Sequence, residues 1–119
     1  MSRSRTVPAL NRTIVLHEGG KLVKFPFKDP DEIDDYKLDW TSRLAPESDT
    51  VATSDWTIVT DMTGDANELV IVVKTNTDSS TTVWLADGTI GNTYILLNHI
   101  TTTGGRTLEQ SVAIKIKAR

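Results

Sequence analysis

The 119-residue sequence has no cysteine, only two histidines and no long apolar run. The absence of cysteine excludes a disulfide scaffold, a thiol nucleophile and a thiolate zinc site. No stretch approaches the roughly 18 apolar residues of a membrane-spanning helix, and the first twenty residues lack the continuous apolar core of a secretory signal. The net charge of −3 gives no overall attraction to nucleic acid or to an anionic membrane. We therefore expect a protein with no cofactor, no metal site and no direct contact with nucleic acid or membrane.

The most regular part of the sequence is a pair of alternating runs near the C-terminus. Core-type residues occupy every second position over residues 94–100, and the alternation resumes over residues 108–116. A period of two is typical of strands with one buried face. The glycine pair at 104–105 can supply the positive φ values of a tight connection. These features predict a β-hairpin, in which Asn98 and Gln110 fall on the buried face and form a candidate cross-strand pair.

Shorter runs upstream have the same character, and no window shows a helical repeat. The segments YKLDW, DWTIV, ELVIVV and TTVWLA read as strands, and KLVKFPF reads as an edge strand because Pro26 lacks the N–H that a central strand needs. Many short strands separated by turn residues predict an all-β fold, an immunoglobulin-like antiparallel β-sandwich. The expected core residues are Tyr36, Leu38, Trp40, Trp56, Val83, Leu85, Tyr94, Leu96, Ile100, Val112 and Ile114.

Tyr94 opens a strand just after a glycine-bearing turn. This placement matches a tyrosine corner, in which the phenol hydrogen-bonds to the backbone a few residues upstream. Two residues later, where an antibody domain has its second cysteine, the chain has Leu96, and Trp56 is the candidate for the buried tryptophan of the third core strand. An apolar contact is therefore expected in place of the disulfide.

The charges near the N-terminus are segregated. Residues 1–28 contain six lysines or arginines and one acid, whereas residues 29–39 contain six acids and one base. We divide the chain into an extended arm, residues 1–20, and a sandwich domain, residues 21–119, joined to an acidic linker. The alternatives for the arm are a solvated segment and a segment that docks on an acidic partner. In the docking alternative the contacts would come from Arg3, Arg5 and Arg12.

The acids and histidines do not form a recognisable reactive site. The acids of DPDEIDD have the oxygen ligands that calcium prefers, but they lack the glycine-bearing loop of an EF-hand, which favours a solvated linker. His17 and His99 accompany no nucleophile elbow or oxyanion motif, so we expect no catalytic residue. Trp84 alternates with two core positions and should face outward, unless another loop covers it. The candidate interface residues are Trp84, Arg43 and His99.

Three motifs occur in a fixed order. The first, K-D-P-x-x-x-x-D-Y-x-x-D-W, spans residues 28–40, and the second, S-D-T-V-x-x-S-x-W, spans residues 48–56. The third runs from Val83 to Ser111 and includes G-x-x-Y-x-L-x-N-x-I-T-T-x-x-G-R. Over roughly residues 28–116 the sequence resembles the immunoglobulin-like fiber-tail adaptor proteins of tailed bacteriophages. It departs from them at Arg43, near which relatives often have a second tryptophan, and in a longer segment between residues 59 and 81.

The resemblance implies a structural virion protein of the neck or tail, assembled in the cytoplasm of the bacterial host. Its implied partners are a neck or tail connector or tail-tube protein, a tail fiber or spike protein, and other copies of itself in a ring. The alternative is a stand-alone carbohydrate-binding or adhesion module, in which Trp84 or Trp56 stacks on a sugar ring. The basic arm favours the virion adaptor, because a stand-alone module would not need it.

Overall fold

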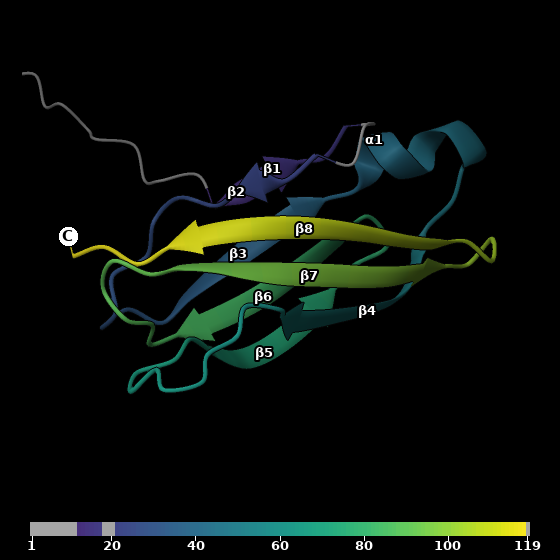
Figure 1. The fold of residues 1–119 in the computed structure, drawn as a ribbon. Helices are drawn as coiled ribbons and strands as arrows, with labels where there is room; N and C mark the ends of the chain where they lie inside the picture. The colour runs from purple at the N-terminus through teal and green to yellow at the C-terminus, as the bar shows by residue number, and fades with distance from the viewer. Residues whose placement is uncertain (1–11, 18–20, 119) are drawn as a thin grey trace, which may run out of the picture.

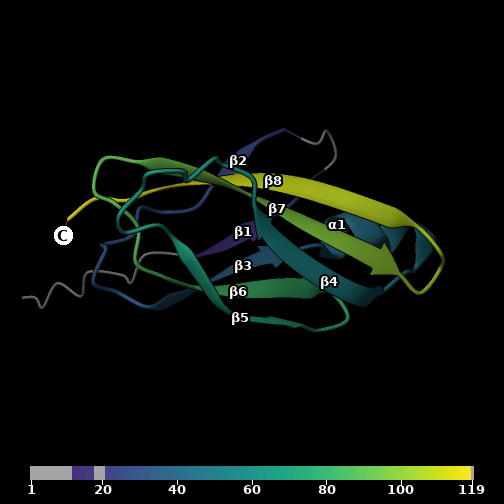
Figure 2. The ribbon, with the colours of Figure 1, turned by 60° about the horizontal axis from the view of Figure 1, so that its bottom comes forward.

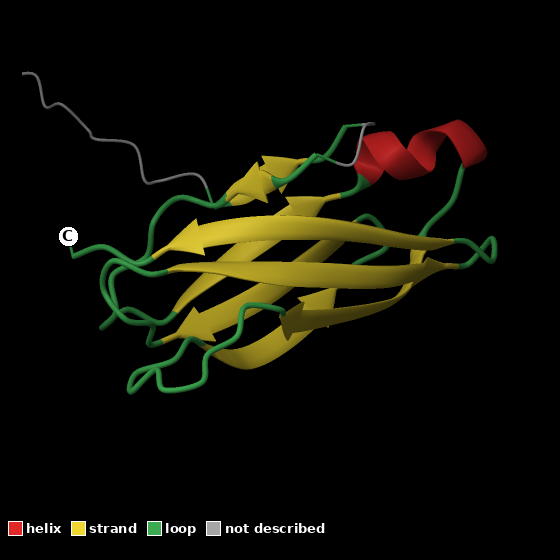
Figure 3. Ribbon diagram, viewed as in Figure 1, coloured by secondary structure: helices red, strands yellow, loops and turns green. Residues whose placement is uncertain are grey.

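The structure is a computed structural model, and it describes residues 12–17 and 21–118. Eight strands and one short helical segment follow each other in these ranges (Figures 1 and 3). The strands are β1 (Thr13–Val15), β2 (Val23–Lys24), β3 (Asp34–Asp39), β4 (Val51–Ile58), β5 (Val70–Asn76), β6 (Ser80–Ala86), β7 (Thr93–Thr102) and β8 (Thr107–Lys115). The helical segment consists of α1 (Thr41–Leu44) and a 3-10 turn (Ala45–Glu47).

The strands form two four-stranded sheets that face each other (Figure 2). The first sheet has the order β1-β3-β6-β5, and the second has the order β2-β8-β7-β4. The edge strands β1 and β2 pair in parallel with β3 and β8, whereas every other neighbouring pair is antiparallel. The predicted all-β, immunoglobulin-like sandwich is confirmed, and the edge position of the segment that contains Pro26 agrees with its missing N–H.

The core lies between the sheets and is fully shielded from water. Each of the eleven residues expected there is at most 1% exposed. Alternation along β3, β6, β7 and β8 explains this, because every second side chain of a strand points to the same face of the sheet. The sequence did not point to Leu16, Phe25, Leu44 and Leu69, which lie outside the strands and also pack in this core.

The expected domain boundary at residue 20 is wrong. β1 belongs to the first sheet, and Leu16 is 1% exposed in the core, so the sandwich begins at least eight residues earlier than residue 21. The reason is pairing in parallel with β3, where Ile14 lies opposite Leu38. Such pairing is invisible in a three-residue strand without an alternating pattern. Residues 1–11, which include Arg3 and Arg5, lie outside the described part of the chain.

The acidic linker is also not a linker over its whole length. Its second half forms β3, a central strand of the first sheet, with Tyr36 and Leu38 buried. Two of the three acids on β3 share one arginine. The guanidinium of Arg12 lies 3.1 Å from Asp34 Oδ1 and 3.2 Å from Asp35 Oδ1. The alternation of apolar residues therefore decides the structure here, and the charge run does not.

The short helix was missed because one turn cannot show a helical repeat. α1 contains four residues, and the Trp40 carbonyl accepts the N–H groups of Arg43 and Leu44 at 2.9 and 3.0 Å. Leu44, at 2% exposed, anchors the turn in the core. Pro46 then lies in the first turn of the 3-10 segment, where its missing N–H costs nothing.

Asn98 is buried and links the two sheets. Its Oδ1 accepts hydrogen bonds from Trp40 Nε1 at 3.1 Å and from Thr81 Oγ1 at 2.7 Å, both on the first-sheet side. Its Nδ2 donates to Ser54 Oγ and to the Asp55 carbonyl on β4, at 3.0 and 2.9 Å. Gln110 lies opposite Asn98 in register.

The expected pair between Asn98 and Gln110 does not form, because the two side-chain amides bond other groups. The Gln110 side chain donates to the carbonyls of Lys21 and Ser111.

Replacing Asn98 by alanine should destabilise the sandwich strongly. The Thr81 hydroxyl and the Asp55 carbonyl would lose a buried partner, and each unsatisfied group costs about 1–3 kcal/mol. We expect a loss of roughly 2 kcal/mol or more in the free energy of unfolding, measured by urea denaturation. Leu97→Ala, on the outward face of the same strand, is the control and should cost about 1 kcal/mol or less. Equal losses in the two variants would contradict the bridging role of Asn98.

Candidate interaction surfaces

The described residues show no reactive cluster. Among them, no group of three or more His, Cys, Asp or Glu side chains could hold a metal ion, and no helix is long and apolar enough to cross a membrane. His17 is exposed beyond β1 in the first sheet, whereas His99 lies in β7 of the second, where its Nδ1 is 2.9 Å from Glu109 Oε2. The two histidines therefore do not share a strand, since His17 lies in the connection after β1.

Two of the sequence motifs meet at the end of the sandwich that carries α1 (Figure 1). Asp49 Oδ1 accepts the N–H groups of Gly104 at 2.8 Å and Thr50 at 2.9 Å, and Oδ2 lies 3.2 Å from Arg106 Nε. The hydroxyl of Thr102, and then these N–H groups and Arg106, hold the pKa of the Asp49 carboxyl well below its usual range, although burial opposes them. Asp49 thus joins the start of β4 to the β7–β8 turn.

The tyrosine corner lies at the opposite end and has an additional carboxylate. The Thr89 N–H donates to the Tyr94 hydroxyl oxygen at 3.0 Å, which is the expected bond to the backbone upstream. The hydroxyl in turn donates to Asp65 Oδ2 at 2.5 Å. The Thr89 and Tyr94 hydroxyls lower the pKa of Asp65. Asp65 lies in the segment between residues 59 and 81 that lengthens this chain, and no signal in the sequence pointed to it.

Lys28, the first residue of the K-D-P motif, is completely buried. Its Nζ donates to the carbonyls of Asp29 at 2.9 Å and Asp87 at 2.8 Å. Burial lowers the pKa of its ammonium group, while neighbouring acids, Asp87 first, oppose that shift. Gly88, which follows Asp87, has a φ of +106°, and a Cβ on this glycine would lie 2.7 Å from the Ile116 side chain. This motif therefore fixes the turn after β6.

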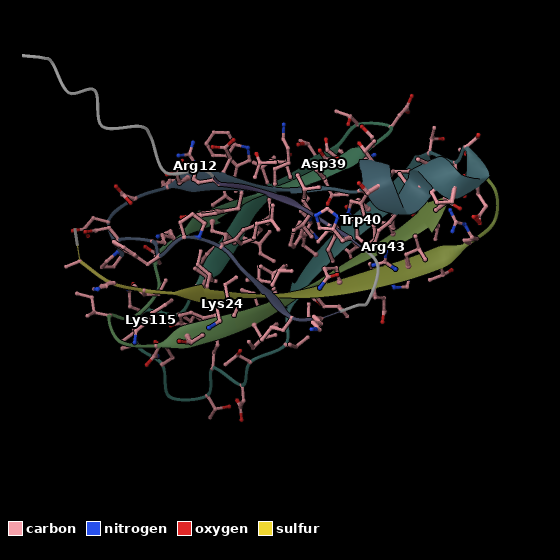
Figure 4. All side chains as sticks on the ribbon, turned by 90° about the horizontal axis from the view of Figure 1, so that it is seen from above. Arg12, Lys24, Asp39, Trp40, Arg43 and Lys115 are labelled. Atoms are coloured by element: carbon pink, nitrogen blue, oxygen red, sulfur yellow. The ribbon has the colours of Figure 1, made fainter. Side chains whose placement is uncertain are left out.

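The polar residues that define the motifs are thus largely occupied within the chain. They close the two ends of the sandwich and leave its outer faces and edges available for contacts. The three candidate interface residues do not lie together on these surfaces. Trp84 is on the outer face of the first sheet and 38% exposed, His99 is on the outer face of the second sheet, and Arg43 lies beside Trp40, with its Cζ 5.1 Å from the ring centroid (Figure 4).

Arg12, one of the three expected docking arginines, is not free for a partner. Besides its ion pairs with β3, its Nε donates to the Asp35 carbonyl at 2.8 Å. Its role is to fasten the start of β1 to β3. Because the chain's own acids already bind its guanidinium, we do not carry the docking expectation over to Arg12. Arg3 and Arg5 lie outside the described residues.

The sequence did not single out the apolar edge formed by β5. Val70, Val72 and Val73 are 40%, 50% and 45% exposed. The ELVIVV run was read as a strand, and an apolar run without alternation normally indicates burial on both faces. The structure instead places it at the edge of the first sheet. The lack of alternation in ELVIVV was a signal of an unusual strand. It could not distinguish a strand buried on both faces from an edge strand with exposed apolar side chains.

Comparison with known proteins gives one family. The sequence model described as podophage GP4 fiber-tail adaptor protein gp77 matches residues 28–115. No curated protein matches the chain. Among solved structures, the chain is similar to the PKD domain from KIAA 1837 protein, with 15% identity, a TM-score of 0.44 and coverage of 98% of this chain and 94% of that chain. It is also similar to the cysteine protease inhibitor EhICP2 from Entamoeba histolytica, with 17% identity, a TM-score of 0.36 and coverage of 87% and 95%.

Removing the Tyr94 hydroxyl should weaken the tyrosine corner. Tyr94→Phe loses the bonds to Thr89 and Asp65, and we expect a loss of about 1 kcal/mol or a little more in unfolding free energy. Tyr94→Ala also removes a buried ring and should cost about 3–5 kcal/mol. Chemical denaturation measures both, with Thr93→Ala at the exposed neighbouring position as the control. An unchanged midpoint for Tyr94→Phe would show that the corner does not stabilise the fold.

The depressed pKa of Asp49 predicts a pH dependence of stability. Because the folded state lowers this pKa, the charged carboxylate stabilises the fold above its unfolded pKa of about 3.9, and the stabilisation is lost as pH falls below that value. The denaturation midpoint should therefore fall less steeply between pH 6 and about 2.5 in Asp49→Asn than in the wild type. The exposed Asp78→Asn is the control. Parallel pH profiles for Asp49→Asn and wild type would be inconsistent with this assignment.

Proposed function

The chain belongs to the podophage GP4 fiber-tail adaptor family, and on this premise we propose that it joins the neck or tail connector, or the tail tube, to a tail fiber or spike. The observation that carries the proposal is the family match, which spans residues 28–115 and so includes six of the eight strands, all except β1 and β2.

The join would be made by protein–protein contacts alone, with no catalytic step. The chain would act in the virion, in the tail or neck region, after assembly in the cytoplasm of the bacterial host.

An adaptor needs two separate surfaces, and the fold offers them. β1 and β5 form opposite edges of the first sheet. The N-terminal arm precedes β1 in the sequence, and Arg3 and Arg5 can make bidentate bonds with carboxylates of a connector. Since Arg12 is bound to β3, the docking arm is proposed to be residues 1–11 rather than residues 1–20. The opposite edge remains for the second partner.

The two different edges of the sandwich would also suit a ring of copies of this chain. A contact between two different patches on neighbouring subunits is head-to-tail, and it forms a ring when the rotation between subunits closes. The β1 and β2 edges lie on one side of the two sheets, and the β5 and β4 edges lie on the other. A ring around the connector would present every arm in the same direction. We propose this arrangement for the copies of this chain in the particle.

The alternative function, a stand-alone sugar-binding module, was based on two tryptophans that could stack on a sugar, and the structure excludes one of them. Trp56 is 1% exposed, so its ring cannot stack on a sugar. Trp84 is accessible, but it lies on the outer face of a sheet between Asp35 of β3 and Val73 of β5. The family match does not support the alternative. We therefore retain the adaptor function alone.

Removal of residues 1–11 tests the arm. Because β1, Leu16 and the Arg12 ion pairs are kept, we expect a soluble, folded sandwich with an unchanged melting temperature. Supplied to a phage that lacks its own copy, this truncated chain should not enter particles, and fibers should be lost with it. Electron microscopy of the particles and immunoblotting for the chain measure both effects.

The matched control is the full-length chain with Arg3→Gln and Arg5→Gln, which keeps the length of the arm and removes its charge. It should incorporate poorly if guanidinium–carboxylate bonds hold the arm. Normal incorporation of the truncated chain, with fibers attached, would rule out the arm as the docking element and move the connector contact onto the sandwich.

A further inference from the structure

We propose that β5 is the docking edge for an extended, uncharged strand of the fiber-side partner, which adds to the first sheet beside Trp84. The proposal rests on the adaptor function and names the surface and the chemistry of its second contact. It assigns a role to the segment that lengthens this chain between residues 59 and 81.

β5 has one edge without a hydrogen-bonded strand among the described residues, although β4 of the second sheet lies close to it. It is the last strand of its sheet, with β6 on one side only. An edge strand presents a row of unpaired N–H and C=O groups that can pair with another chain. The two edge strands on the other side of the sandwich contain only three and two residues, whereas β5 contains seven. Six of the seven side chains of β5 are exposed.

β5 also carries little of the charge that usually protects such an edge. Natural edges are commonly blunted by lysine, proline or inward-pointing charges. The one charged residue of β5 is Lys74, and its Nζ lies 2.7 Å from Asp55 Oδ1 on β4, so this ion pair neutralises the charge against the second sheet. A bulge between Ile71 and Val73 is present, but it carries a half-exposed valine, Val72, instead of a charge.

The outer face next to this edge extends the apolar surface. Val73 lies directly opposite Trp84 in the β5–β6 register, and both side chains are exposed. Added strands gain affinity from main-chain hydrogen bonds and specificity from alternate side chains. An incoming strand would place one side chain opposite Val73 and within reach of the indole of Trp84. An apolar or β-branched residue fits that position, because it would cover the exposed side chains of Val73 and Trp84, which a charged residue would leave exposed to water.

The position of β5 identifies the fiber side as the source of this strand. The arm that is proposed to contact the connector precedes β1 in the sequence, and β1 is the opposite edge of the same sheet. Pairing of β5 with β5 of a second copy would be a two-fold contact, which closes at two copies and cannot build a ring. One strand pair would also bury far less than the roughly 1,200–2,000 Å² of a stable interface between globular subunits. An extended segment of a fiber does not need to bury that area by itself, because the rest of the fiber can make further contacts.

The first test is complementation with Val73→Lys, which places a charge at the centre of the edge. The variant should melt like the wild type, because Val73 is 45% exposed, and should enter particles normally, but these particles should lack fibers. Val59→Lys is the matched control, with a 56% exposed valine beyond the end of β4, and should keep fibers. Val72→Lys is a second variant and should behave like Val73→Lys.

The outcomes separate this proposal from the adaptor function. Fibers attached normally to particles that contain Val73→Lys and Val72→Lys would overturn β5 as the docking edge and leave the adaptor function intact. Folded variants that fail to enter particles would overturn the fiber-side assignment, because β5 would then serve the connector or another copy. Fibers retained on particles that lack this chain altogether would instead refute the adaptor function itself.

The second test identifies the occupant directly. The chain has no cysteine, so Val72→Cys provides one site for a thiol-reactive photocrosslinker. In particles assembled with this variant, illumination should join the chain to the fiber or spike protein, identified by mass spectrometry of the product. The same label at Val59→Cys should give no such product. A product with the connector protein or with a second copy of this chain would overturn the proposal.

Discussion

The amide of Asn98 is bonded to both sheets at once, and this bridge constrains the rest of the sandwich. On one side it holds the Trp40 indole and the Thr81 hydroxyl, and on the other it holds Ser54 and the Asp55 carbonyl. The bonds to Ser54 and Asp55 hold Asn98 to β4 of its own sheet, while the bonds to Trp40 and Thr81 reach the first sheet. These last two fix the position of one sheet over the other, because a slip would leave the buried Trp40 and Thr81 groups without their partner. Trp40 also begins α1, so the same contact positions the helical turn at that end of the sandwich.

The two ends of the sandwich are closed by networks of the same kind. Asp49 ties β4 to the β7–β8 turn, while Tyr94, Asp65 and Lys28 fix the loops at the other end. These contacts use polar residues of all three sequence motifs. The family resemblance is therefore carried largely by residues that build the fold, whereas recognition is left to surfaces that the motifs do not define. The two surfaces that we propose for recognition are the basic arm, which precedes β1 in the sequence, and β5, at the edge of the first sheet opposite β1.

Strand alternation was enough to predict the sandwich, its hairpin and the eleven core residues, because period-two burial is written directly in β3, β6, β7 and β8. It was not enough for β1, whose three residues show no period and which pairs in parallel with a strand twenty-four residues away in register. For the same reason the role of Arg12 was misjudged, since its acidic partners come from a segment that looked like a linker. The contacts of Asp65 and the exposure of the β5 valines depend on how distant segments pack together, and a local sequence pattern cannot predict that.

The most direct test of this account is a high-resolution electron microscopy reconstruction of the intact particle. The account predicts the sandwich between the connector and the fiber, with the N-terminal arm on the connector and an added strand of the fiber-side partner along β5, over Val73 and Trp84. A reconstruction in which fibers attach to the connector directly, with this chain elsewhere or absent from the junction, would contradict it.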